Sequence, residues 1–131
     1  MIDHLSTYAT DYEKTRSFYE QVFEPLGYSL VAEFTTDEED DDFPGRRVCS
    51  FGENSNSTFW VIETRRQATS RHIAFAASSS QSVDEFYQAA LKAGGKENGA
   101  PGLRPHYHSQ YYGAFVFDPD GNDIEAVFHG H

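Results

Sequence analysis

The stretch Ser70-Arg71-His72-Ile73-Ala74-Phe75-Ala76-Ala77 begins a second copy of the pattern with which the chain starts. Shifting the sequence by 68 positions lays residues 1–9 over residues 69–77 and places His4 on His72. Further pairs that match at this shift are Phe18 with Phe86, Tyr19 with Tyr87, and Gly27 with Gly95. Agreement of several positions at one shift indicates an internal duplication. A strand, a helix and the turn after it therefore recur in one register.

Hydrophobic periodicity predicts a strand, a helix and three strands in each copy. Strands are expected at 2–9, 28–35, 47–51 and 58–63, and again at 71–77, 96–103, 111–118 and 122–128. Capping-box patterns at residues 10–13 and 82–85 predict where the two helices begin. Gly27 and the pair at 94–95 predict where they end, because glycine tolerates the left-handed exit from a helix. Mixed sheets covered on one face by helices are the natural packing.

The length and composition are those of one ordinary domain. With 131 residues, of which 38% are hydrophobic and 15% aromatic, the chain can fill one core. We therefore expect a single domain at 1–131 with an internal repeat of 1–63 and 70–128.

Net charge and cysteine content limit the partners and the cellular compartment that we expect. The formal net charge of −11 repels nucleic acid and anionic membrane surfaces, so neither is expected as a partner. The acidic run at 37–42 is expected to be a solvated loop. Apolar runs are too short to span a membrane, residues 1–4 lack the start of a leader, and Cys49 is the only cysteine. We therefore expect a cytoplasmic protein without an internal disulfide.

A second match between the copies indicates candidate metal ligands on their last strands. Val61-Ile62-Glu63 matches Asp123-Ile124-Glu125 at a shift of 62, so each copy has a histidine on its first strand and a glutamate on its fourth. If the copies pack about a pseudo-twofold axis, four side chains can meet on the face opposite the helices: His4, Glu63, His72 and Glu125. Imidazole and carboxylate ligands favour zinc, nickel, cobalt, iron or manganese over calcium or magnesium. A single strand histidine is more often an ordinary polar residue than a metal ligand, so the hypothesis depends on the pairing.

These features resemble the vicinal oxygen chelate superfamily, which includes glyoxalase I, bleomycin-resistance proteins and extradiol dioxygenases. The resemblance rests on the duplicated module, the two strand histidines, and the segment Phe117-Asp118-Pro119-Asp120-Gly121-Asn122-Asp123-Ile124-Glu125. It implies an α+β fold of two tandem βαβββ modules that form a partly closed mixed barrel with helices outside, in a homodimer. It also implies metal binding by His4, His72 and Glu125, with Glu63 in the place of a fourth ligand.

The resemblance implies a metal-dependent lyase or isomerase of the glyoxalase type. Such a site would chelate neighbouring oxygens of a small-molecule substrate and stabilise an enediolate, with Glu125 or Glu63 as the base. Two alternatives stay open. One is a metal-free binding protein of the bleomycin-resistance type, and the other is a single-domain extradiol dioxygenase that needs only His4, His72 and Glu125.

An aromatic and histidine-rich segment is expected to flank the substrate pocket. The candidate pocket residues are Trp60, Arg104, His106, His108, Tyr111 and Tyr112. They could bind a carboxylate or a phenol, or relay protons, and His106 and His108 could equally be ordinary loop residues.

Overall fold

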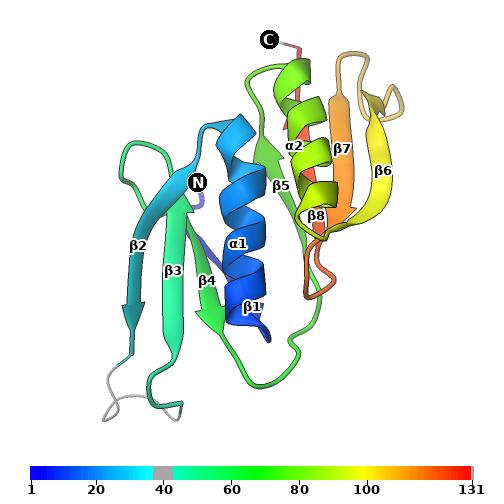
Figure 1. Ribbon diagram of the computed structural model, residues 1–131. Helices are drawn as coiled ribbons and strands as arrows, with labels where there is room; N and C mark the ends of the chain where they lie inside the picture. Colours follow the sequence, from blue (N-terminus) through cyan, green and yellow to red (C-terminus); the bar gives the residue numbers. More distant parts are fainter. Residues whose placement is uncertain (37–42, 131) are drawn as a thin grey trace.

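The structure is a computed structural model that describes residues 1–36 and 43–130 (Figure 1). The acidic run at 37–42, predicted as a solvated loop, lies outside the described residues. None of the helices in the described ranges is long and apolar enough to cross a membrane.

Two modules of the same topology follow one another along the chain. The first comprises β1 (Leu5–Ala9), α1 (Tyr12–Phe23), the short 3-10 helix η1 (Glu24–Leu26), β2 (Ser29–Thr35), β3 (Arg47–Gly52) and β4 (Phe59–Glu63). The second comprises β5 (His72–Ala76), α2 (Ser80–Lys92), β6 (Lys96–Leu103), β7 (Tyr112–Phe117) and β8 (Asp123–Phe128). Their sheets have the orders β1-β4-β3-β2 and β5-β8-β7-β6, with the first strand of each module parallel to its fourth. The predicted α+β fold of two tandem βαβββ modules is confirmed, and the two sheets do not close into a full barrel.

The helices begin at side-chain caps, and the predicted glycines follow them within a few residues. Asp11 caps α1 by accepting a hydrogen bond from the backbone N–H of Lys14 at 3.3 Å, and Gly27 takes a left-handed φ of 82° after η1. Ser79 caps α2 by accepting from the N–H of Ser82 at 3.1 Å. The predicted start at Ser82 was therefore wrong, because the serine run offers an earlier cap.

The core lies between the helices and the sheets and is continuous across both modules. Helix α1 buries an apolar stripe at three- and four-residue spacing, and Figure 1 shows α1 and α2 side by side on the same side of the strands. The ring of Phe23 contacts those of Phe59, at 5.5 Å, and Phe75, at 4.9 Å between centroids. Because Phe75 belongs to β5, this aromatic cluster joins the second module to the first.

The turn between β7 and β8 makes a second connection between the modules. Asp118, 5% exposed, accepts hydrogen bonds from the Tyr19 hydroxyl at 2.5 Å and from the Asn122 side chain at 2.8 Å. Two backbone N–H groups, of Asp120 and Asn122, donate to its other oxygen at 2.9 Å. Since Tyr19 lies on α1, this buried carboxylate links the first helix to the last turn.

Candidate metal site

The site is built by two neighbouring parallel strands, β5 and β8. The strand pairing sets His72 opposite Asp123 and Ala74 opposite Glu125. His72 therefore lies beside both carboxylates, which are two residues apart on β8 and share a face. His72 Nε2 is 3.1 Å from Glu125 Oε1, and His72 Nδ1 is 3.1 Å from Asp123 Oδ2.

Glu125 is a buried carboxylate with a fixed orientation. It is 1% exposed, and its Oε2 accepts a hydrogen bond from the Tyr111 hydroxyl. Burial, and then the hydrogen bond to Glu125, raise the pKa of Tyr111, which keeps the phenol as the donor. Gly113 leaves room for this carboxylate, because a Cβ there would lie 3.2 Å from Glu125 Oε2. The His72 side chain is 51% exposed, so the site opens to solvent at the imidazole.

The donor set fits a transition metal. Metal–nitrogen and metal–oxygen bonds of about 2.0–2.2 Å bring adjacent ligand atoms to roughly 3 Å from one another, close to the separation of His72 Nε2 and Glu125 Oε1. Asp123 Oδ2 lies 3.1 Å from His72 Nδ1, so Nε2 is the ring nitrogen that faces Glu125. Asp123 is itself held by a hydrogen bond from the Asn98 side chain at 3.1 Å.

His4 is not brought to this pair within one chain. It directly precedes β1, and its Nδ1 contacts Asp3 Oδ1 at 2.7 Å, with the imidazole 57% exposed. Across residues 1–36 and 43–130, no three His, Cys, Asp or Glu side chains gather closely enough to hold a metal ion. One chain therefore supplies a pair of ligands, and the expected centre of four is not assembled.

The strand register also corrects the alignment that matched Glu63 with Glu125. Ser6, the counterpart of Ala74 at the shift of 68, pairs with Trp60. Trp60 is thus the structural counterpart of Glu125, at a shift of 65. Glu63 lies three residues further on, an odd number, so it points to the opposite face of the sheet.

Glu63 forms an ion pair on the side of α1. Arg47 donates to it from Nε at 3.1 Å and from Nη2 at 2.7 Å, and another nitrogen of Arg47 bonds Glu13 on α1 at 2.9 Å. The hydrogen bonds from Arg47 lower the pKa of Glu63. This side chain holds the sheet to the helix and does not face His72.

Replacing Glu63 with glutamine is expected to lower stability slightly at neutral pH. Because the native pKa of Glu63 is lowered, its ionisation stabilises the fold above the unfolded value of about 4.3. That contribution is lost as pH falls through the lowered native pKa, so the difference from wild type should shrink on acidification. Urea unfolding at several pH values measures this difference, with Glu97→Gln at an exposed position of β6 as the control. A difference that stays constant down to acidic pH would contradict the assignment.

The predicted pocket residues divide between the site and other surfaces. Arg104 lies over the ring of Phe115 at 5.4 Å, and Phe115 stacks on His72 with 6.2 Å between ring centroids. Arg104 and Tyr111 thus flank the His72–Glu125 pair. Tyr112 instead donates to Asp84 of α2 at 2.6 Å, away from the site.

The remaining pocket candidates lie farther out. His108 Nε2 is 2.9 Å from His129 Nδ1, and the His108 ring is 5.4 Å from that of Tyr111, so this pair forms a rim beside the site. His106 packs on Tyr107 with ring centroids 4.2 Å apart. Trp60 belongs to the other module, where its ring is 6.2 Å from Phe34.

Asp123 and Phe115 complete the surroundings of His72 and were not predicted as site residues. A sequence signal existed for Asp123, because it precedes Glu125 by two residues on one strand and must share its face. No comparable signal marked Phe115, whose position depends on the pairing of β7 with β8.

Comparisons with known proteins agree with this fold. A family model described as the Glyoxalase/Bleomycin resistance protein/Dioxygenase superfamily matches residues 1–126. A glyoxalase/bleomycin resistance protein from Albidiferax ferrireducens is 26% identical over 95% of both chains, with a TM-score of 0.74. A search of curated proteins gave no match.

Two more distant structures share the fold. A glyoxylase/bleomycin resistance protein/dioxygenase domain from Frankia is 14% identical, with a TM-score of 0.71 over 98% of this chain and 97% of that one. A glyoxalase I mutant from Zea mays is 19% identical, with a TM-score of 0.70 over 96% of this chain but 46% of the maize chain. The repeated βαβββ topology and the family match over nearly the whole chain show that it belongs to the glyoxalase, bleomycin resistance protein and dioxygenase superfamily.

Proposed function

We propose that this protein is a metal-dependent lyase or isomerase of the glyoxalase type, acting on a small molecule with two neighbouring oxygens. The observation that supports this most is the buried Glu125 carboxylate beside His72 Nε2. A buried carboxylate is costly unless donors or a cation compensate its charge. Tyr111 supplies one donor, and a half-exposed imidazole completes a pair that is open to an incoming metal and substrate.

Each residue around this pair has a role in the proposal. His72 and Glu125 would hold zinc, nickel, cobalt, manganese or iron, and Asp123 would orient His72 through Nδ1. When bound, the metal would stabilise the negative charge that develops as a carbon next to the chelated oxygens loses its proton. Glu125 is the candidate acceptor of that proton, with Tyr111 holding the carboxylate in position.

A homodimer would complete the ligand set. Within the described residues of one chain the two sheets are separate, with no strand pairing between them. On the first module, the sheet face that points away from the helices carries Trp60 and the 48% exposed Phe34. His4 is the counterpart of His72 in the duplication. Packing the first module of one subunit on the second module of another would bring His4 of the partner subunit toward His72 and Glu125.

The register also favours a second candidate function. Trp60 stands where the fourth ligand of a symmetric set would lie, which leaves His4, His72 and Glu125 as the nominal ligands. Two imidazoles and one carboxylate are the set that holds Fe(II) in many non-haem oxygenases. An extradiol dioxygenase therefore fits the residues present.

Metal titration tests the proposal. Zinc, nickel, cobalt, manganese or Fe(II) at about 100 times its Kd should stabilise the protein by about 2.7 kcal/mol, seen as a raised thermal midpoint. His72→Ala should remove this gain, whereas His106→Ala should retain it. Stabilisation by Fe(II) with dioxygen uptake on catechols would select the dioxygenase. No stabilisation by any of these metals would overturn both metal-dependent functions and favour a metal-free binding protein.

A further inference from the structure

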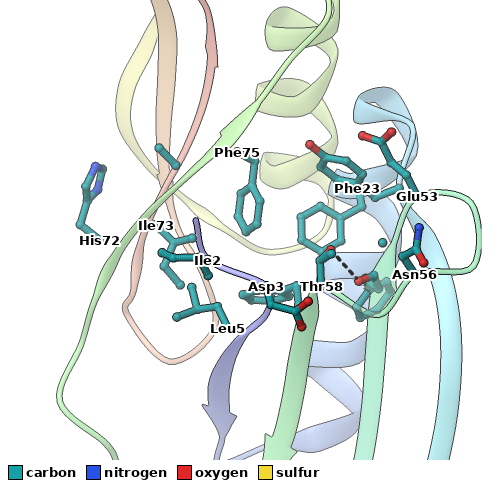
Figure 2. Close-up of a pocket in the computed structure, with 15 residues that line it drawn as sticks. Ile2, Asp3, Leu5, Phe23, Glu53, Asn56, Thr58, His72, Ile73 and Phe75 are labelled. Carbon is teal, nitrogen blue, oxygen red and sulfur yellow. Dashed lines mark hydrogen bonds between the residues drawn. The ribbon is translucent and has the colours of Figure 1, made fainter.

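We propose that a cavity between the two modules, separate from the His72–Glu125 pair, binds a small organic cation with an aromatic or alkyl body. The cavity has a volume of about 630 Å³ and lies where β1 and β5 begin, on the side of the sheets that faces the helices. His72 contributes to its lining, but Figure 2 shows the imidazole on the other side of β5 from Phe75. A ligand here would therefore not occupy the proposed metal site.

The inner wall of the cavity is aromatic and already ordered. Phe75 projects into the space between the modules, with its ring 5.3 Å from Phe59 and 6.4 Å from Tyr28 between centroids (Figure 2). Phe23 packs behind it, and Leu5 adds an aliphatic side. Rings held by one another in edge contacts need little reorganisation to receive a ligand, so less affinity is lost to ordering.

The rim of the cavity is acidic. Among the lining residues in the described part of the chain, Asp3 and Glu53 carry carboxylates and there is no lysine or arginine. Burial, and then the charge of Glu53, raise the pKa of Tyr28, so the field of this carboxylate reaches the aromatic wall. Glu53 sits at the start of a tight turn in which its carbonyl accepts from the N–H of Asn56 at 2.9 Å. The carboxylate is thus carried by a fixed backbone.

These features together select the charge of the ligand. Aromatic faces attract cations, and two carboxylates at the mouth would pair with an ammonium or guanidinium group. An anionic ligand would meet these carboxylates and a protein of net charge −11. A neutral ligand would gain only the apolar contacts.

Three probes of similar size test the inference: phenethylammonium, 2-phenylethanol and 3-phenylpropionate. Titrations followed by calorimetry and by NMR should show phenethylammonium binding about 10-fold more tightly than the alcohol, and no binding of the carboxylate. Amide shifts should change at Ile73 and Phe75 and not at Gly113. Glu53→Gln, in an exposed turn, should weaken binding of the cation several-fold, whereas Glu97→Gln removes the same charge elsewhere and should not.

Several results would overturn the inference. Equal affinity for the ammonium and the alcohol would show that the acidic rim does not contribute to binding. Equal effects of Glu53→Gln and Glu97→Gln would show that only the net charge of the protein matters. Loss of binding in Glu125→Gln would show that the ligand occupies the proposed metal site instead of the cavity. Retained cation binding in Glu125→Gln is the expected result, because Glu125 belongs to the proposed metal site and does not line the cavity, and it would hold even if the proposed metal function failed.

Discussion

Mixing His4→Ala and His72→Ala variants is expected to restore metal sites that neither variant forms alone. In the proposed dimer each site takes His4 from one subunit and the His72–Glu125 pair from the other. A mixed dimer then has one site that lacks both imidazoles and one that retains both. Random exchange of equal amounts gives half mixed dimers, so metal binding and activity should recover to about a quarter of the wild-type value.

The outcome distinguishes three arrangements. Sites completed within one chain would give no recovery, because every chain in the mixture lacks a histidine. Full metal binding by His4→Ala alone would show that the His72–Glu125 pair suffices without His4. A mixture of His72→Ala and Glu125→Gln is the matched control. Both residues belong to the half of the site that one subunit supplies, so no mixed dimer contains an intact site.

The part of this site that could be predicted from the sequence is the part that lies on one pair of neighbouring strands, β5 and β8. His72, Asp123 and Glu125 lie on neighbouring parallel strands whose register agrees with the alternation of side chains. Glu63 was aligned with Glu125 by matching a short string of letters, while the pairing of β1 with β4 sets the register three residues away. An odd error in register reverses the face of a strand. Local sequence cannot reveal it, because the partner strand lies more than 50 residues away along the chain.

The fold could be predicted more completely because its signals are local and occur twice. Alternation marks the strands, three- and four-residue spacing marks the helices, and the shift of 68 repeats both. The start of α2 was missed by a short distance, since several serines offered caps. How the two modules face one another could not be predicted, because contacts between α1 and α2 and the ring of Phe23 against Phe75 decide it.

The segment that most resembles the family has a structural explanation in this chain. Asp118 and Asn122 close the turn before β8, and Asp120 accepts from the Thr10 hydroxyl at 2.6 Å just before α1 begins. The turn thereby fixes where β8 starts, and with it the position of Glu125. The motif supports the position of Glu125 from a distance, through hydrogen bonds that join the modules.

Asp118→Ala is accordingly expected to destabilise the protein by about 3 kcal/mol, a large part of a typical 5–15 kcal/mol. The change would leave the buried Tyr19 hydroxyl, the Asn122 side chain and two backbone N–H groups without their acceptor. Urea unfolding at neutral pH measures the loss. Asp120→Ala is the matched control in the same turn, where more exposed hydrogen bonds should contribute about 1 kcal/mol or less.

A double-mutant cycle with Tyr19→Phe isolates the link between the modules. Tyr19→Phe alone should cost about 1 kcal/mol, and its effect should largely vanish when Asp118 is already alanine, because the two groups share one hydrogen bond. Additive effects would show that Asp118 stabilises only its own turn. A loss for Asp118→Ala no larger than that for Asp120→Ala would contradict the role of the buried carboxylate altogether.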